Sequence, residues 1–412
     1  MRKELPMPMP IALSRRASEV VKCVGRSVGR RWDMATKPAR RQKVSRKAAN
    51  VSFLLAMAQR WGPGLHLWPM KTTLLCLLTA GFLFGRQPAV QAQSTPAASS
   101  ELRIAFGSCN RHDLPQLLWD DIAHDQPQVW IWLGDNIYGD SDDPAVLRAK
   151  YDAQRAQPGY RQLQAQGTQV IGTWDDHDYG RNDGDKNYPF KAQNQQLALD
   201  FLGEPANTAR RRQEGIYTSY EYPVGNKKVK VILLDDRYFQ DPLFRDSALV
   251  YHPNPTGDVL GEAQWQWLRQ QLTNSDADAH IIASGIQFLP QEHRFEKWAN
   301  FPQARQRLLT LLKDTRPKGV LLISGDRHIG EISRVPVPGL RRPVYEVTSS
   351  GLTHPAAHNT SEPNPYRVGP LVNQKHYALF QFRPHGRRLG VTASLRGDDG
   401  KVFYTEEIKL NR

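Results

Sequence analysis

The chain has 412 residues, with 55 Lys and Arg, 41 Asp and Glu, and a formal net charge of +14. This excess lies at the front, because residues 1–92 contain 17 basic and 3 acidic residues and the rest contains 38 of each. Residues 93–412 are therefore formally neutral, and the basic isoelectric point gives no reason to expect a nucleic-acid or anionic-membrane partner for them.

Residues 70–92, MKTTLLCLLTAGFLFGRQPAVQA, predict a secretory signal peptide. A lysine, an apolar stretch and small residues ending at Ala92 follow one another in the order that such signals use. The apolar stretch is shorter than a membrane span of about 20 residues, so no permanent span is expected, although an uncleaved anchor is an alternative. Cleavage after Ala92 predicts a secreted or periplasmic protein.

Residues 1–69 precede this signal and have an Arg-rich, patternless composition. They would keep the signal away from the start of the chain, so we expect Met70 to be the true start and residues 1–69 to be a disordered, over-extended gene prediction. A twin-arginine leader that uses Arg15 and Arg16 is the alternative, but no apolar stretch follows it closely. Residues 93–100, QSTPAASS, are typical of a short flexible linker.

Cysteine usage becomes informative once the leader is set aside. Of Cys23, Cys76 and Cys109, cleavage would leave Cys109 alone, so the exported domain would have no internal disulfide. A single thiol in an oxidising compartment is buried and inert, pairs with another chain, or ligates a metal.

Residues 101–412 alternate strand patterns with helical patterns, which predicts one layered α/β domain. Strands are expected at residues 102–108, 128–134, 168–174, 227–235, 279–285 and 318–325. Helices are expected at residues 114–123, 189–202, 262–272 and 302–313. Residues 343–351 and 377–410 predict antiparallel strands joined by glycine-containing turns.

Polar side chains follow each of the six strands. They are Cys109; Asp135 and Tyr138; Asp175, Asp176, His177 and Asp178; Asp235, Asp236, Arg237 and Tyr238; Gln287; and Asp326 and His328. Open α/β sheets bind ligands at the carboxyl ends of their strands, so this distribution predicts a functional site there.

The residue types favour metal ions over a Ser-His-Asp arrangement, since no G-x-S-x-G and no Gly-rich phosphate loop occurs. A thiolate and a phenolate together suit a strongly Lewis-acidic ion such as Fe³⁺. The carboxylates suit a second, hard cation such as Ca²⁺.

The motifs FGSC, WLGDNIY, TWDDHD, LLDDR and SGDRHIGE occur in this order. On these motifs the chain resembles the alkaline phosphatase D family of the metallophosphoesterases over nearly all of residues 101–410. The resemblance implies a four-layer α/β/β/α sandwich and an exported hydrolase of phosphate monoesters or diesters that uses a metal-activated hydroxide. It also implies Fe³⁺ and Ca²⁺ as cofactors.

The same resemblance implies roles for individual residues. Cys109 takes the place of the first aspartate of the superfamily, Asp135 bridges two ions and Tyr138 supplies the phenolate. Asp176 takes the position of an asparagine ligand, and His177 lies next to it. In the mechanism that we expect from this set, His177 protonates the leaving oxygen or stabilises the charge that develops there. Two further metal ligands are implied at the last motif, Asp326 and His328.

Other assignments stay open. Asp175, Asp178 and Asp183 are turn residues or neighbours of the ligands, and Gln287 stands where many metallophosphoesterases have a histidine ligand. Arg237 either contacts the phosphate or forms a structural ion pair with Asp235. His112, His293 and His354 have no motif around them and are expected at the surface or next to the ligands.

This is a short form of the family, since the first motif begins about 15 residues after the expected cleavage site, so substrate preference cannot be carried over. Two other functions remain as alternatives: a hydrolase of the same scaffold acting on phospholipid or cell-wall polymer diesters, and a non-catalytic protein that holds metal for structure. Neither the oligomeric state nor the natural substrate follows from the sequence.

Overall fold

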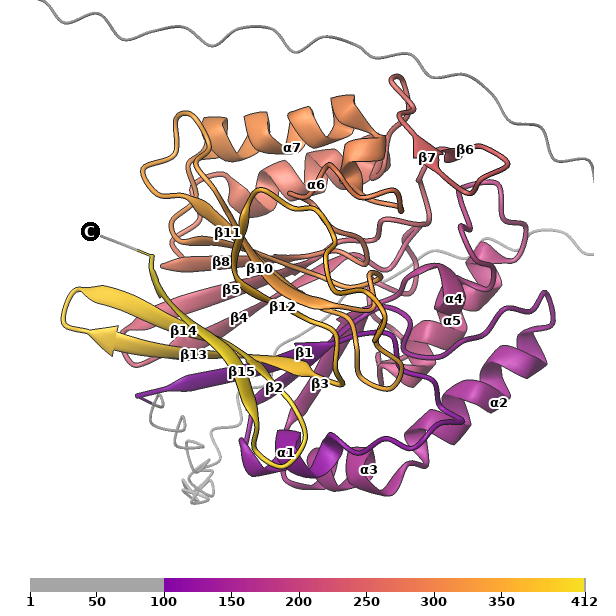
Figure 1. Cartoon of the computed structure of the whole chain (residues 1–412), viewed down its shortest axis with the longest axis horizontal. Helices are drawn as coiled ribbons and strands as arrows, with labels where there is room; N and C mark the ends of the chain where they lie inside the picture. Colours follow the sequence, from indigo (N-terminus) through magenta and orange to yellow (C-terminus); the bar gives the residue numbers. More distant parts are fainter. Residues whose placement is uncertain (1–99, 411–412) are drawn as a thin grey trace, which may run out of the picture. The chain divides into compact units, whose positions relative to one another are not determined.

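The structure is a computed structural model, and it describes residues 100–410 (Figure 1). The expected upstream extension, the signal peptide and all of the linker but its last residue lie outside this range, so those predictions stay predictions. Within residues 100–410, no helix has the length and apolar character needed to cross a membrane.

Two mixed β-sheets form the centre of the domain. The first has six strands, in the order β15 (Val402–Lys409), β14 (Arg388–Arg396), β13 (Tyr377–His385), β1 (Leu102–Gly107), β2 (Val129–Leu133) and β3 (Gln169–Thr173). The second has seven, in the order β12 (Arg367–Val372), β10 (Gly330–Val335), β11 (Val344–Ser349), β9 (Val320–Ser324), β8 (Ala279–Ala283), β5 (Lys227–Leu233) and β4 (Thr218–Val224). A small hairpin joins β6 (Phe244–Arg245) to β7 (Tyr251–His252).

Parallel pairing brings the strand ends to one edge. In the first sheet β1 pairs in parallel with β2, and β2 with β3. In the second sheet β5, β8, β9 and β11 pair in parallel in turn. The carboxyl ends of parallel neighbours lie at the same edge, so the polar loops that follow them are brought together.

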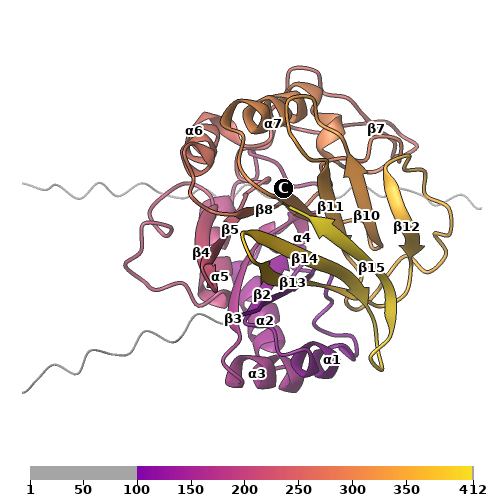
Figure 2. The same ribbon diagram turned by 90° about the vertical axis from the view of Figure 1, so that its left-hand side faces the viewer.

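Helices cover the outer face of each sheet (Figures 1 and 2). Those on the first sheet are α1 (Trp119–His124), α2 (Pro144–Arg155), α3 (Pro158–Ala165), α4 (Asp176–Tyr179) and α5 (Lys191–Phe201). Those on the second are α6 (Gly261–Leu272) and α7 (Pro302–Thr315), with the short 3₁₀ helix η1 (Trp298–Asn300).

The apolar core has three parts that match these layers. Side chains such as Ile104 and Phe380 of the first sheet pack against Val231 and Ile281 of the second. A second cluster joins the first sheet to its helices, and a third joins the second sheet to α6 and α7 around Trp265. The four-layer α/β/β/α fold is confirmed, because each sheet buries one face on its partner and the other under helices.

All six expected strands and the antiparallel tail are present, but the helices depart from expectation in two ways. The helix expected at residues 114–123 begins only at Trp119, and residues 114–118 before it are irregular or in a turn. The helices α2, α3 and α4 were not expected, and neither were the strands β4, β6, β7, β10 and β12.

Candidate metal centre

The polar loops of the two sheets meet through Cys109, which follows β1. Its thiol donates to Oδ2 of Asp135, after β2, at 3.4 Å. It also lies 3.7 Å from the carbonyl oxygen of Asp326, which follows β9 in the other sheet. The expected site at the carboxyl ends of the strands is therefore one continuous cluster.

The backbone at this cluster is unusual. Cys109, Asp135, Asp326 and His328 all have positive φ angles, of 56°, 48°, 64° and 56°. Residues other than glycine adopt this left-handed conformation rarely, at a cost of about 1–2 kcal/mol each. Strain of this kind concentrates at functional sites, where the fold holds side chains in positions that a relaxed turn would not reach.

Three expected ligands form a first group. One donor atom each from Cys109, Asp135 and His328 lies within 4.8 Å of the others. Tyr138 completes the group, because its hydroxyl donates to Oδ2 of Asp135 at 3.2 Å and lies 3.1 Å from Nε2 of His328. A thiol, a carboxylate, a phenol and an imidazole thus converge on one point.

A second group shares Asp135 with the first. It contains Asp135, Asp176 and His177, again with donor atoms within 4.8 Å of one another. Oδ2 of Asp135 faces Cys109 and Tyr138. Its Oδ1 is buried and has no hydrogen-bond partner among the described residues. Asp135 therefore belongs to both groups and offers a different oxygen to each side.

The electrostatics of these groups fit a cation. Burial raises the pKa of the Cys109 thiol to about 11. Burial, and then the negative charges of Asp135 and Cys109, raise the pKa of Tyr138 well above its usual value. Burial also raises the pKa of the Asp135 carboxyl far above its usual range. A bound cation removes this penalty, because it favours the deprotonated form of every ligand.

His177 is oriented by a carboxylate outside the ligand groups. Its Nδ1 lies 2.7 Å from Oδ1 of Asp140, and its ring lies 4.1 Å from that of Tyr138 between centroids. Burial lowers the pKa of His177, but the carboxylates of Asp135, Asp140 and Asp176 outweigh burial and raise it to about 10. The imidazole is thus held in its protonated form.

Asp326, expected as a ligand, stands apart from the groups of three. Its carboxyl lines the cavity beside them, and burial raises its pKa. A third group contains Asp176, Asp183 and Glu296. Asp183 accepts a hydrogen bond from the Tyr251 hydroxyl on one oxygen and from Arg245 on the other.

Arg237 is enclosed, and its partners differ from the expected one. Its guanidinium is fully buried and donates to Asp175 at 2.5 Å and to Glu296 at 2.9 and 3.0 Å. Asp235 instead accepts a bond from the backbone N–H of Arg237. The expected pairing with the Asp235 side chain is wrong, and the geometry favours a structural role over contact with phosphate.

Arg327 is a cavity residue that the sequence analysis missed. It lies between Asp326 and His328, and its guanidinium is 3.9 Å above the Phe295 ring and 2.5 Å from Glu362. Its Nε is buried without a partner among the described residues. Its place inside the last motif was the available signal.

Asp178 and Gln287 are outside the ligand groups and bond to neighbouring residues. Asp178 accepts from the backbone N–H groups of Asp175 and Ile137, which is a helix-capping arrangement. Gln287 donates to Glu331 and to Thr348, away from the ligand groups.

Two of the histidines without a motif lie near the site. His354 accepts from Nδ1 of His328 through its carbonyl oxygen at 3.0 Å. His293 is among the residues that line the cavity. His112 takes no part in the ligand groups.

A cavity of about 780 Å³ opens over both ligand groups. Asp135, Asp176 and His177 line it, and so do Arg327 and Phe295. Its volume is that of ordinary small-molecule sites, so a substrate can reach the groups described above.

Comparison with known proteins gives three similarities. The family model for the PhoD-like phosphatases matches residues 104–388. Alkaline phosphatase D of Bacillus subtilis (strain 168) is 28% identical over 105 residues, which are 24% of this chain and 17% of that protein. The aligned region thus spans less than a fifth of that relative.

Among solved structures, that of PhoD is similar with a TM-score of 0.57 and 18% identity, over 76% of this chain and 70% of that one. The structure of GAP50, the anchor in the inner membrane complex of Plasmodium, has a TM-score of 0.48 and 15% identity, over 76% and 90%. The PhoD structure shares the fold described above.

Proposed function

Since the chain belongs to the PhoD-like phosphatase family, we propose that it is a metal-dependent hydrolase of phosphate monoesters or diesters. The observation that carries the proposal is the position of Asp135. It is shared by two ligand groups, and its second oxygen is buried without a partner among the described residues.

The first group offers a thiol, a phenol, a carboxylate and an imidazole, so we propose that Cys109, Tyr138, Asp135 and His328 would hold ferric iron. Asp135 and Asp176, with Asp326 beside them, would hold a hard cation such as calcium. Such ions would supply the positive charge that polarises phosphoryl oxygens and lowers the pKa of the attacking water.

His177 is proposed as the general acid. Its Nδ1 is engaged by Asp140, which fixes the ring and leaves Nε2 to carry the transferable proton. The raised pKa keeps that proton in place until negative charge develops on the leaving oxygen. Proton donation of this kind contributes about 10²- to 10⁴-fold in rate.

Arg327, rather than Arg237, is proposed to neutralise a non-bridging phosphoryl oxygen. Its guanidinium lines the cavity and has one nitrogen without a partner among the described residues. The donors of Arg237 are used on Asp175, Gln240 and Glu296 in the interior.

Substitution of Asp135 tests the proposal directly. Asp135→Asn keeps the shape of the side chain but removes the charge that two ions would share. We expect it to lower both bound metal and hydrolysis of p-nitrophenyl phosphate and bis-p-nitrophenyl phosphate by at least about 100-fold. The matched control is Asp142→Asn, an exposed aspartate of the same loop.

Four outcomes of this experiment are informative. Full metal content and activity in Asp135→Asn would overturn the proposal. Hydrolysis of the diester alone would favour a specialised diesterase. Metal bound by the unmodified protein without hydrolysis of either ester would favour the non-catalytic alternative. Loss of activity in both variants would point to a general defect of the loop.

Export is also proposed, and it rests on the sequence alone. The signal layout of residues 70–92 and the single cysteine of the expected mature chain support it.

A further inference from the structure

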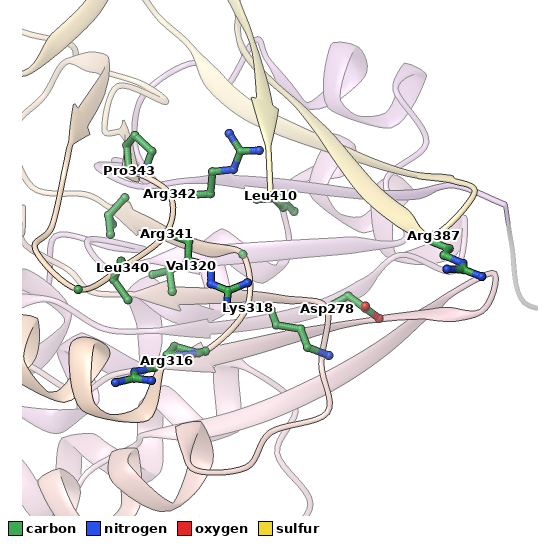
Figure 3. A pocket seen from close by; sticks show the side chains of 14 residues that line it. Asp278, Arg316, Lys318, Val320, Leu340, Arg341, Arg342, Pro343, Arg387 and Leu410 are labelled. Carbon is green, nitrogen blue, oxygen red and sulfur yellow. The ribbon is translucent and has the colours of Figure 1, made fainter. Parts of the chain in front are cut away.

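A second cavity, of about 620 Å³, lies at the edge of the second sheet opposite the ligand groups. Figure 3 shows the residues that line it. Its walls come from the loop before β9, the loop between β10 and β11, the turn between β13 and β14, and the residue after β15. The ligand groups follow the carboxyl ends of the strands, whereas this cavity surrounds the amino ends of β8, β9 and β11. A strand of five residues spans about 17 Å, so the two sites are separated by the length of the sheet.

The cavity is strongly basic, and we name it the basic cavity. Five of its lining residues are cationic: Arg316, Lys318, Arg341, Arg342 and Arg387. No ion pair joins any of these five side chains to a carboxylate within residues 100–410. The one acidic lining residue, Asp278, is already bonded to the backbone N–H of Lys228 and lies 3.6 Å from Nζ of Lys227.

This gathering of charge is notable in a domain without net charge. Residues 93–412 contain as many acidic as basic residues. Elsewhere in the described chain many surface arginines face a carboxylate, as Arg307 faces Glu262 and Arg383 faces Glu101. Five unneutralised cations around one hollow repel one another, and an anionic ligand would relieve that repulsion.

The remaining lining residues are apolar. Val320, Leu340, Val344 and Leu410 contribute to the wall, and Val320, Val344 and Leu410 are buried. Four of the five cations are arginines, whose planar guanidinium matches the oxygens of a phosphate group in pairs.

We propose that the basic cavity binds a soluble organic anion that carries two phosphate groups next to an apolar part. The five cations and Asp278 sum to a formal lining charge of +4. Two phosphate groups carry about −3 to −4 at pH 7, which matches this charge. The volume lies within the range of ordinary small-molecule sites.

A free ligand fits this cavity better than a lipid headgroup in a membrane. Surface binding to a bilayer uses exposed apolar side chains beside the basic ones. The large exposed hydrophobic residues of the described chain are Leu117, Phe244, Leu249, Phe295 and Val402, and none of them lines the basic cavity.

The test uses methylenediphosphonate, in which a CH2 group replaces the bridging oxygen of a diphosphate, so that a phosphatase cannot cleave it. Its affinity is measured by titration calorimetry on the purified full chain and on Arg341→Glu/Arg342→Glu. The matched control is Arg155→Glu/Arg161→Glu, which makes the same change in charge at two exposed arginines on α2 and α3, the helices that cover the other sheet. Any methylenediphosphonate binding that all three proteins share is assigned to metal ions held by the ligand groups.

Loss of two guanidinium contacts should weaken binding by about 10- to 100-fold in Arg341→Glu/Arg342→Glu and leave the control within about twofold. Arg316→Glu/Lys318→Glu, on a different loop, should weaken it similarly. Equal affinity in all these proteins would overturn the proposal.

A second experiment, with lipid vesicles, distinguishes a soluble phosphate ligand from the headgroups of a membrane. Loss of sedimentation with phosphatidylglycerol vesicles in Arg341→Glu/Arg342→Glu, at unchanged methylenediphosphonate affinity, would assign the charges to a lipid surface and overturn the soluble ligand. Hydrolysis of p-nitrophenyl phosphate should stay within about twofold in every pair, so this result is independent of the proposed catalytic function.

Discussion

Replacing Arg237 by methionine would leave two buried carboxylates without their counter-charge. The Asp175 side chain is fully buried and the Glu296 side chain is 4% exposed, so water cannot solvate either carboxylate in place of the arginine. Methionine fills much of the same volume, so the change removes charge and hydrogen bonds more than packing. The variant therefore isolates the ionic contribution of the pair to stability.

The magnitude follows from the number of contacts broken. Arg237 donates to Asp175, to both oxygens of Glu296 and to Gln240. Removal of one partner from a buried ion pair typically costs about 3–5 kcal/mol of unfolding free energy, because the other charge stays buried.

The loss should also depend on pH. In the intact protein burial already raises the pKa of Glu296 to about 8, although Arg237 opposes it. Without the arginine that pKa rises further. When the pKa of a carboxyl is higher in the folded than in the unfolded protein, the free energy of unfolding falls as the pH rises above the unfolded-state pKa. Below about pH 8 Glu296 is mostly protonated in both folded proteins, so the deficit of Arg237→Met should be larger at pH 9 than at pH 6.

Urea unfolding followed by tryptophan fluorescence measures this deficit, and steady-state kinetics measures KM on the same preparations. The matched control is Arg181→Met, because Arg181 faces Asp142 at 3.7 Å but is 60% exposed. Its unfolding free energy should change by no more than about 0.5 kcal/mol. A variant Arg237→Met as stable as the control, with a greatly raised KM, would refute the structural role and restore the contact with phosphate.

Four other predictions follow from the site and the leader. The iron-loaded protein should be coloured, and Tyr138→Phe should abolish or shift the visible band with little change in the circular dichroism spectrum; an active, iron-loaded and colourless protein would exclude the phenolate. His177→Asn should lower kcat by about 10²- to 10⁴-fold with metal content nearly intact by elemental analysis, whereas loss of metal would identify a ligand. Burial lowers the pKa of His376 to about 4, so stability is full above pH 6.5 and falls toward pH 4 as the unfolded chain binds the proton; urea unfolding of His376→Gln should show a weaker decline over that range, and an equal decline would contradict the assignment. Mass spectrometry of the exported protein should find Gln93 or a close neighbour first, and a mature chain that retains Met1 would contradict the signal peptide.

The strands and the site were predictable because each strand is a short apolar stretch with a polar residue directly after it. Parallel pairing then brings those residues together without any further information. The helices α2 and α3 were missed because their apolar stripe is narrow: α2 buries Leu147 and Tyr151, and α3 buries Tyr160 and Leu163. Few apolar positions at helical spacing give little periodic signal.

The partners of Arg237 could not be predicted for a different reason. Glu296 lies 59 residues further along the chain, in the loop between β8 and η1, with no motif around it. Asp235 lies two positions before Arg237, and its side chain accepts a hydrogen bond from the backbone N–H of Arg237 instead of pairing with the guanidinium. Pairings between distant loops depend on packing that local patterns do not encode.

The pairing of β1 with β13 has a consequence for how the domain is made. Leu102 of β1 lies opposite Phe382 of β13, so the first strand of the domain pairs with a strand from near the end of the described chain. During synthesis β1 can pair with β2 as soon as both have emerged, but its other edge stays open until residues 377–385 follow. Contacts of such long sequence separation form slowly, and unpaired strand edges invite aggregation. Completion of the first sheet, and of the layer that supports Cys109, is thus a late event in folding.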